Sequence, residues 1–293
     1  MQAIIPPVSK VLLLQEVATL SVKDRYVERG KFQVYIVQAP KIPHILKEIG
    51  RLRETTFREV GEGTGNAIDI DEFDQYYHNL FIWDTENQQI VGGYRVGTGD
   101  TIFEQHGIAG FYINSLFNIE TPAHAILKKS LELGRSYIIK DYQKGYLPLF
   151  LLWQGILFFL IKNPQYRYLI GPVSISKYYS HTSKSMIVDF VKQHYFNEEV
   201  ANYFEPRTPF ISHPSNFSKI YKLGHKLTDL EKFMATIEPA HIKVPVLLKQ
   251  YTKLNARFIG FNLDPNFSDA LDGLMLLDLR KLPEEIIRML EEK

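Results

Sequence analysis

The sequence predicts an α/β fold of the α+β kind, with a sheet flanked by helices and extra elements at the C-terminal end. Three observations point to it. The 293 residues are 45% hydrophobic, which is enough for a full core and too much for general disorder. Apolar residues switch along the chain between the strand period and the helix period. A hairpin pattern within that order places at least two strands antiparallel.

The elements follow from these periods in chain order. Residues 1–30 contain Pro6-Pro7 and a short amphipathic piece, so we expect an N-terminal linker or lead-in helix and a domain over 31–293. Thr121-Pro122 marks the start of a short helix. The expected strands are 32–37, 80–83, 90–96, 130–139, 166–173, 258–261 and 274–279, and the expected helices include 42–57, 147–161 and 244–251.

Residues 147–161 form the strongest apolar run, and they raise the question of a membrane. As a helix the run covers only roughly 22 Å, short of the ~30 Å hydrocarbon layer. Pro148, Gln154 and Gly155 interrupt it. We therefore expect a core helix, with contact at a membrane surface as the alternative. The N-terminus lacks the basic and apolar layout of a signal peptide, which favours a cytoplasmic protein.

Composition excludes several classes of function. The chain has 34 basic and 33 acidic residues, so its net charge of +1 gives no reason to expect nucleic acid as a partner. It has no cysteine, which excludes disulfides and thiolate chemistry. The loop 61–65 is rich in glycine but lacks the lysine and spacing of a nucleotide-binding loop. The histidines and Asp69-x-Asp71 form no coherent ligand set, so we expect no metal.

Charged residues in apolar strand patterns are the main sign of function. Glu132 and Arg135 stand three residues apart in a run that reads as a buried strand, and Arg95 stands alone in another. An acidic cluster with Asp71 and Asp74 lies upstream. Buried charges cost free energy unless they are paired or used. The pattern predicts an enzyme site assembled from several strands.

These residues, in this order, resemble the GNAT acyltransferase fold and its acyl-carrier-protein-using branch, which includes acyl-homoserine-lactone synthases. The resemblance covers most of residues 31–280. It rests on Arg53 with Phe57, Asp71 with Asp74, Arg95, and Glu132 with Arg135. It implies a GNAT-like central mixed, mostly antiparallel twisted sheet, with its fourth and fifth strands splayed to admit the pantetheine arm of the donor.

The strings 131–136, 152–155 and 245–251 look closer to the ornithine-lipid and glycine-lipid N-acyltransferases, a "hemolysin-like" family. The usual pyrophosphate loop of GNAT enzymes is absent around 142–146. This disfavours coenzyme A and implies acyl carrier protein, whose phosphopantetheine thioester is the donor substrate, with no permanently bound cofactor. The resemblance, with the start of the helix near Leu147, places the single phosphate of that donor near Lys140, Lys144 and Gly145.

The resemblance gives the charged residues roles, each with a structural alternative. Glu132 is the expected base, since burial penalises the charged form of a carboxyl, or else a structural partner of the arginines. Arg95 clamps the carboxylate of the acceptor or is a structural arginine. Glu132 and Arg135 would face opposite sides of a regular strand, so joint action needs a bulge, expected at Gly134.

The remaining candidates are organising or lining residues. Asp71 and Asp74 either hold a loop over the site or cap a helix. His78 is either a base or an ordinary hydrogen-bonded residue. Phe111 and Trp153 are core residues that could also line an acyl tunnel. Two basic patches, Lys128-Lys129 and Lys219 to Lys226, face solvent, the carrier protein or a membrane.

We therefore expect an N-acyltransferase that moves a medium or long fatty acyl group, with or without a hydroxyl group, from acyl carrier protein to an amino acid. Glycine and ornithine both remain open as acceptors. The reaction would be an early step of aminolipid synthesis, in the cytoplasm or on the cytoplasmic face of the inner membrane. One alternative is a lactone synthase that uses S-adenosylmethionine, and another is a non-catalytic membrane-associated module.

Overall fold

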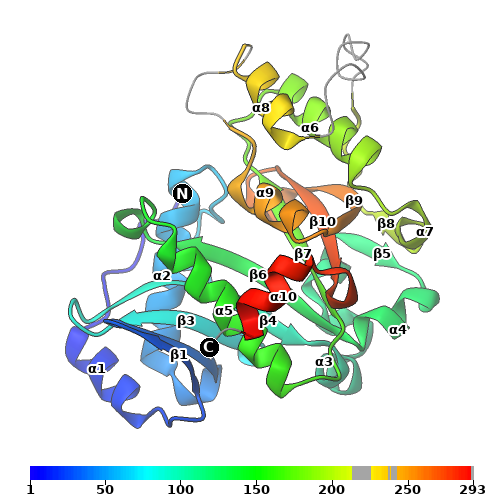
Figure 1. Cartoon of the computed structure of the whole chain (residues 1–293). Coiled ribbons are helices and arrows are strands. Elements are labelled where there is room, and N and C mark those ends of the chain that lie inside the picture. The colour runs from blue at the N-terminus through cyan, green and yellow to red at the C-terminus, as the bar shows by residue number, and fades with distance from the viewer. Residues whose placement is uncertain (213–225, 237, 239–242, 292–293) are drawn as a thin grey trace. The chain divides into compact units, whose positions relative to one another are not determined.

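A computed structural model of the chain describes residues 1–212, 226–236, 238 and 243–291 (Figure 1). It has the predicted architecture of mostly antiparallel sheet flanked by helices. Lys219 and Lys222 of the expected basic patch lie outside the described residues. The chain forms two compact units, unit 1 with residues 1–111 and 128–166, and unit 2 with residues 112–127 and 167–293. Residues 31–293, which we expect to form one domain, contribute to both units, and residues 1–30 belong to unit 1.

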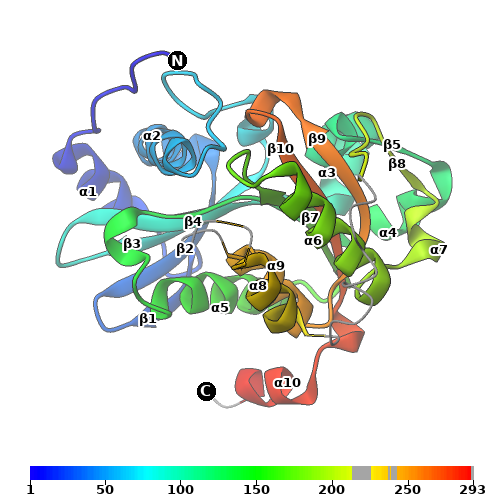
Figure 2. The same ribbon diagram turned by 90° about the horizontal axis from the view of Figure 1, so that it is seen from above.

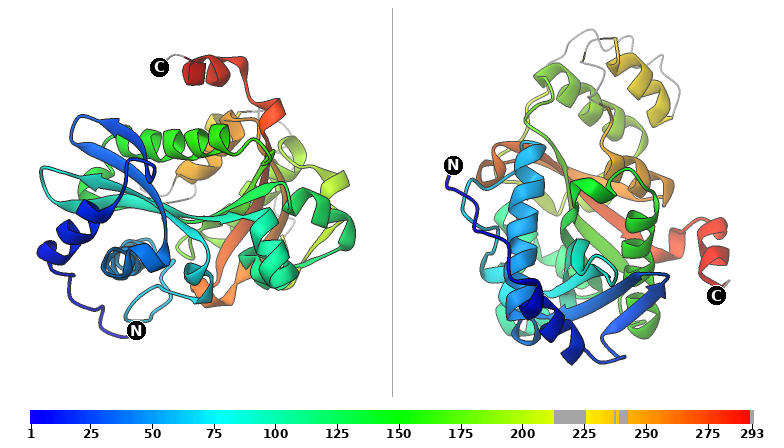
Figure 3. Two further views of the ribbon diagram at one scale, coloured as in Figure 1. Left: turned by 90° about the horizontal axis from the view of Figure 1, so that it is seen from below. Right: turned by 90° about the vertical axis from the view of Figure 1, so that its left-hand side faces the viewer.

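Unit 1 holds a five-stranded antiparallel arrangement in the order β1-β2-β3-β4-β6. Helix α2 contacts β4 and β6, and helix α5 contacts β1 to β4 on the opposite face (Figures 2 and 3). Because both faces are covered, β3 and β4 are buried along nearly their whole length. The elements are α1 Lys10–Thr19, β1 Arg25–Arg29, β2 Phe32–Gln38, α2 Pro43–Glu59, β3 His78–Asp84, β4 Gln89–Thr98, α3 Gly99–His106, β6 Ser130–Ile138 and α5 Leu147–Lys162.

The apolar run at 147–161 is a core helix, as predicted. Leu151, Leu152 and Ile156 of α5 are almost fully buried. Gly155 permits close packing on the sheet, since a Cβ atom there would lie 2.9 Å from the Cγ1 atom of Val34. None of the helices in the described part of the chain has the length and apolar character that crossing a membrane requires.

The N-terminal residues are tied to the rest of unit 1. Glu16 of α1 accepts hydrogen bonds at 2.8 Å from the backbone N–H groups of His44 and Ile45, and so caps α2 from a distance. Strand β1 pairs with β2, so the sheet begins at Arg25, before the expected start at residue 31.

Unit 2 has its own strands and core. Strands β7, β10 and β9 pair antiparallel in that order, and β5 pairs with β8. The buried Asp264 accepts a hydrogen bond of 2.7 Å from the hydroxyl of Tyr112. The elements are β5 Phe117–Ile119, α4 His124–Leu127, β7 Tyr168–Ile175, α6 His181–His194, α7 Glu198–Ala201, β8 Phe204–Pro206, α8 Leu227–Met234, α9 Val246–Lys253, β9 Arg257–Asp264, β10 Ala270–Asp278 and α10 Glu284–Glu291.

Candidate functional site

A buried arginine at the inner side of α2 organises the polar centre of unit 1. Arg53 is 1% exposed, and its two terminal nitrogens donate to the two carboxylate oxygens of Asp74 at 2.9 and 2.8 Å. Its Nε atom lies 3.0 Å from Oδ2 of Asp69. A forked pair of this kind matches the planar guanidinium to the carboxylate and satisfies both charges away from water.

The acidic cluster folds locally as a capped turn. Residues Glu72–Gln75 form the 3-10 helix η2. Asp71 accepts a hydrogen bond from the backbone N–H of Phe73 at 3.0 Å, and Asp74 accepts one from the N–H of Asp71 at 2.9 Å. This reciprocal capping box fixes both aspartates, which is the capping role that the sequence predicted. The remaining carboxylate oxygens point to arginines from other elements.

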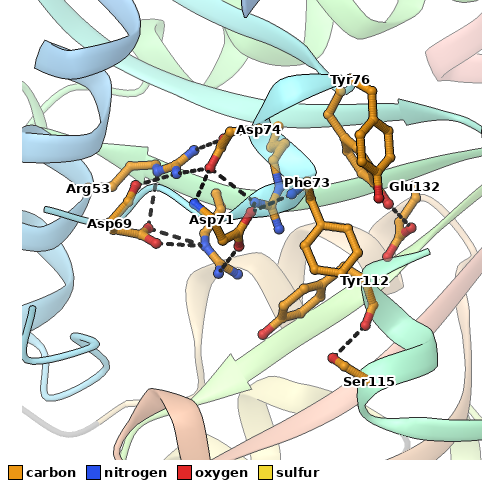
Figure 4. Close-up of polar contacts among 12 residues, drawn as sticks. Arg53, Asp69, Asp71, Phe73, Asp74, Tyr76, Tyr112, Ser115 and Glu132 are labelled. Atoms are coloured by element: carbon orange, nitrogen blue, oxygen red, sulfur yellow. Dashed lines mark hydrogen bonds and ion pairs between the residues drawn. The ribbon is translucent and has the colours of Figure 1, made fainter. Parts of the chain in front are cut away.

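Two further arginines complete the cluster. The Nη1 atom of Arg95 on β4 donates to Asp71 and lies 3.3 Å from Oδ2 of Asp74. Arg95 is 1% exposed. The Nη2 atom of Arg135 on β6 donates to Oδ2 of Asp71 at 2.9 Å, and its Nε atom lies 3.2 Å from Oδ2 of Asp69. We call this set the ion-pair frame: Arg53, Arg95, Arg135, Asp69, Asp71 and Asp74. Figure 4 shows the three aspartates gathered on the side of Arg53, with Glu132 apart from them.

A bulge in β6 brings Arg135 to the frame. Glu132 pairs with Gly97 and Gly134 pairs with Arg95, but the register then shifts so that Tyr137 pairs with Gly93. Arg135 takes up the shift with a φ angle of 52°. The extra residue turns the Arg135 side chain to the side of the sheet where Arg95 lies. The bulge expected at Gly134 is therefore present one residue later.

The frame holds Asp69 and Asp74 in the ionised state. Burial alone would raise the pKa of Asp74, but the charge and hydrogen bonds of Arg53, with the charge of Arg95, hold that pKa well below its usual range. Burial would likewise raise the pKa of Asp69, and the charges of Arg135 and Arg53 outweigh it and lower the pKa. Burial would lower the pKa of Arg53, and Asp69 and Asp74 raise it instead. Three cations thus face three anions.

Glu132 lies on the same face of the sheet as Arg95, since its partner Gly97 is two residues from Arg95 on β4. It is 1% exposed, and its Oε2 atom accepts a hydrogen bond of 2.5 Å from the hydroxyl of Tyr77. Tyr77 precedes β3 and is also 1% exposed. A buried carboxyl beside this charge-balanced frame is an arrangement that can take up a proton from a substrate.

Aromatic rings surround this carboxyl and the nearest guanidinium. The Cζ atom of Arg95 lies 5.4 Å from the ring centre of Phe73 and 5.3 Å from that of Tyr77, which is cation–π geometry. Tyr76 donates to the carbonyl oxygen of Gly110 at 3.0 Å. Burial, and next the negative charge of Glu132, raise the pKa of Tyr76 to about 12. Its hydroxyl therefore stays protonated at neutral pH.

Two of the predicted residues lie on the other face of the sheet. His78 pairs with Val96, one residue along from Arg95, and its ring centre lies 5.7 Å from that of Phe159 in α5. Burial lowers the pKa of His78. Trp153 belongs to α5, which covers the same face. The structure therefore separates both side chains from the ion-pair frame, whereas the sequence grouped them with it.

The two phenylalanines occupy core positions in unit 1. Phe57, on α2 one turn after Arg53, is 8% exposed. Phe111 is 0% exposed and follows Gly110, whose carbonyl oxygen receives the Tyr76 hydroxyl. Its ring centre lies 6.4 Å from that of Phe103. Phe111 is thus a buried residue next in sequence to the one that the Tyr76 hydroxyl contacts.

The residues expected to bind phosphopantetheine lie in the turn between β6 and α5. Lys140, Lys144 and Gly145 are exposed, and Nζ of Lys140 lies 3.7 Å from Glu59. The turn is eight residues beyond Glu132, or roughly 25 Å along an extended strand. The structure therefore places these residues at the opposite end of β6 from Glu132.

The glycine-rich loop 61–65 binds a residue of the protein itself. The backbone N–H groups of Thr64 and Gly65 donate to the buried carboxylate of Glu54 at 3.1 and 2.9 Å. Within the described ranges, no group of three or more histidine, aspartate and glutamate side chains is placed so that it could hold a metal ion.

The sequence pattern placed Asp69 and Phe73 within the acidic cluster but gave them no role of their own in the site, and it did not indicate Tyr76 or Tyr77. The available signal was the strand period, because Tyr77 and Asn79 share a face with Arg95 whereas His78 does not.

Comparison with known proteins places this centre within a recognised domain. The family described as Acetyltransferase (GNAT) domain matches residues 52–154, a span that contains the whole ion-pair frame and Glu132. A protein of Bacteroides thetaiotaomicron named glycine N(alpha)-acyltransferase is 30% identical over 97% of this chain and 88% of its own length. One of the same name from Phocaeicola vulgatus is 28% identical over 97% of this chain and 91% of its own length.

A third relative matches only part of the chain. The L-ornithine N(alpha)-acyltransferase of Rhodobacter capsulatus is 31% identical over 36% of this chain and 43% of its own length.

Proposed function

Because this chain belongs to the GNAT family of N-acyltransferases that includes these relatives, we propose that it acylates the α-amine of an amino acid, with glycine or ornithine as the acceptor. The donor is a medium or long fatty acyl group, with or without a hydroxyl group, carried as a thioester on acyl carrier protein. The product is an N-acyl amino acid, and the reaction is an early step in making an aminolipid.

The observation that carries this proposal is the buried Glu132 beside the ion-pair frame. Attack on a thioester requires a neutral amine, so a base must remove a proton. Glu132 takes that proton, the amine nitrogen bonds to the carbonyl carbon, and the carbon–sulfur bond breaks. The carrier thiolate leaves and takes the second proton, which the nitrogen gives up as the amide forms.

The acceptor also needs a partner for its own carboxylate. Arg95 and Arg135 both bind Asp71, but the side chain of Arg95 is 1% exposed, whereas that of Arg135 is 8% exposed and that of Asp71 is 27% exposed. We assign the contact with the carboxylate to Arg135, while Arg95 and Arg53 hold the aspartates in place behind it. A guanidinium suits this task because it binds a carboxylate through two hydrogen bonds.

For the donor, we propose that the phosphate of the carrier arm binds near Lys140, Lys144 and Gly145, with the arm extended along β6 towards Glu132. Both lysines are exposed, and a lysine side chain is suited to contact a phosphate. Coenzyme A is the less favoured donor, because residues 142–146 lack the usual pyrophosphate loop.

We place the enzyme in the cytoplasm, at the face of the inner membrane, because an N-acyl amino acid is amphiphilic. Exposed apolar side chains on α1 and the following turn support this, with Val11 at 61%, Leu14 at 37% and Val22 at 77% exposure. Lys10 and Lys23 are exposed beside them, which suits an anionic lipid surface.

A product assay tests the proposal. Purified protein with acyl carrier protein substrate is supplied with each amino acid in turn, and free carrier thiol and product mass are measured. We expect thiol release that depends on the amine, together with an N-acyl amino acid. Thiol release without an amine, or release only with S-adenosylmethionine and formation of an acyl lactone, would contradict it.

A further inference from the structure

The hydroxyl of Tyr77 lies between two acceptors. It is 2.5 Å from Oε2 of Glu132 and 3.3 Å from the carbonyl oxygen of Gly110. A tyrosine hydroxyl carries one proton, so it can donate to only one of the two at a time. The shorter distance, and the stronger bond that a charged acceptor forms, assign the proton to Glu132 while Glu132 is ionised.

The surroundings hold the Tyr77 ring in this position. A Cβ atom on Gly97 would lie 2.5 Å from Cε1 of Tyr77, so only glycine at position 97 leaves room for the ring beside Glu132. The Cζ atom of Arg95 lies 5.3 Å from the ring centre, and the ring of Phe73 meets it edge-on at 6.0 Å. The ring is therefore fixed, and the hydroxyl proton is the part that can turn.

During catalysis, protonation of Glu132 changes which of the two oxygens accepts a hydrogen bond from the Tyr77 hydroxyl. Once Glu132 has taken the proton of the amine, it becomes a donor and no longer needs one from Tyr77. The Gly110 oxygen has two lone pairs and accepts from Tyr76 with one of them. It can therefore receive the Tyr77 proton as well.

We propose that Tyr77 is the positioning residue of the Glu132 base, and that its hydroxyl donates to ionised Glu132 and turns to the carbonyl of Gly110 when Glu132 is protonated. This inference rests on the proposed function for the role of Glu132 as the base. It adds a second residue, absent from the sequence prediction, that stabilises the base in both of its protonation states without touching the substrate.

The test compares Tyr77→Phe with Tyr76→Phe. Both variants remove one hydroxyl that contacts Gly110, but only the first removes the donor to Glu132. In Tyr77→Phe we expect kcat to fall roughly ten- to hundredfold, as for loss of a hydrogen bond to a charged group, with little change in KM. The acid limb of the plot of kcat/KM against pH should shift to higher pH by about one pH unit. Tyr76→Phe should keep the limb at its wild-type position.

A double variant shows whether Tyr77 acts through Glu132. If it does, Tyr77→Phe added to Glu132→Gln should lower the rate no further than Glu132→Gln alone. Additive losses, or an unchanged acid limb in Tyr77→Phe, would overturn the inference.

A measurement without turnover separates this inference from the proposed function. The carboxyl carbon of Glu132 is assigned by carbon-13 NMR from its absence in Glu132→Gln, and it is titrated in wild type and in Tyr77→Phe. The titration midpoint should be higher in Tyr77→Phe even if no amino acid is ever acylated. Equal midpoints would overturn the inference, whereas a wild type that transfers no acyl group would overturn only the proposed function.

Discussion

At the scale of single residues, the charges of Arg53 and Asp74 depend on each other. The two side chains are 1% and 0% exposed, and ions of this size are strongly disfavoured away from water unless they are paired. The forked contact at 2.9 and 2.8 Å supplies that pairing, and Asp69 and Arg95 extend it. Breaking one contact should therefore leave a buried charge without compensation.

We predict that Asp74→Asn lowers the free energy of unfolding by about 3–5 kcal/mol, because Arg53 keeps its charge in the interior. Urea unfolding measures it. The matched control is Glu284→Gln, which removes an exposed pair with Arg288 at 3.5 Å and should change stability by less than about 0.5 kcal/mol. If the two substitutions lowered the free energy of unfolding equally, the buried pair of Arg53 and Asp74 would matter no more for stability than an exposed pair, which would contradict this prediction.

The same pairing predicts how stability depends on pH. The folded-state pKa values of Asp69 and Asp74 lie below the unfolded value of about 3.9, so the unfolded chain takes up protons first on acidification. Their contribution is therefore fully present above about pH 5 and is lost as the pH falls. The free energy of unfolding, measured with urea between pH 5 and pH 3, should fall more steeply with decreasing pH for wild type than for Asp69→Asn. Parallel slopes would contradict the assignment.

The residue scale also shows what the sequence could and could not reveal. Arg53, Asp71, Asp74, Arg95 and Arg135 were all predicted to be site residues, and the structure brings them together. The sequence offered ion pairing as an alternative to catalysis but did not indicate which aspartate binds which arginine, because pairing across α2, β4 and β6 depends on tertiary packing. The sequence did not indicate Tyr77, because a tyrosine next to a strand is indistinguishable from a core residue until its hydroxyl has a partner.

At the scale of elements, the junction of β4 and β6 shapes the site. The bulge at Arg135 turns that side chain to the frame, and Gly97 on β4 leaves room for the Tyr77 ring opposite Glu132. The bulge was predictable, since Glu132 and Arg135 could not otherwise serve one face. The close approach at Gly97 was not, because it depends on a ring from another segment.

We predict that Gly97→Ala disturbs the site and that Gly134→Ala does not. A Cβ atom at position 97 would lie 2.5 Å from Cε1 of Tyr77, whereas one at position 134 would have nothing within 4 Å. Overpacking of this kind costs about 1–3 kcal/mol, and displacement of Tyr77 should also reduce turnover. Thermal unfolding and acyl-transfer rates measure both effects. A Gly134→Ala variant as damaged as Gly97→Ala would contradict the argument.

Most elements with a clear period were predicted, and the exceptions have physical reasons. The hairpin of β3 and β4 and the core helix α5 are confirmed. Strand β1 was read as part of a lead-in because only Val27 of its five residues is buried, which removes the apolar alternation.

At the scale of the whole molecule, a net charge of +1 gives no general attraction to an anionic surface. The membrane attachment that we propose must then come from a local patch. In this proposal the patch consists of Val11, Leu14 and Val22, which are exposed on α1 and the following turn, with Lys10 and Lys23.

We predict that replacing Val11, Leu14 and Val22 together by Glu weakens binding to vesicles of anionic lipid by about tenfold or more, through lost apolar contact and added repulsion. Co-sedimentation measures it. The control is Ile211→Glu, since Ile211 is 72% exposed but lies in unit 2, outside the patch. Equal binding of the triple variant and wild type would contradict the membrane contact.

The account as a whole depends on Glu132 as the base for an amine. The most direct measurement is kcat/KM for transfer from an acyl carrier protein thioester to the acceptor amino acid, compared between wild type and Glu132→Gln across pH. We expect kcat/KM of the variant to fall roughly 10²–10⁴-fold and its pH profile to lose the acid limb. Circular dichroism should show that the variant is folded. A folded Glu132→Gln variant with the wild-type rate and profile would contradict the account.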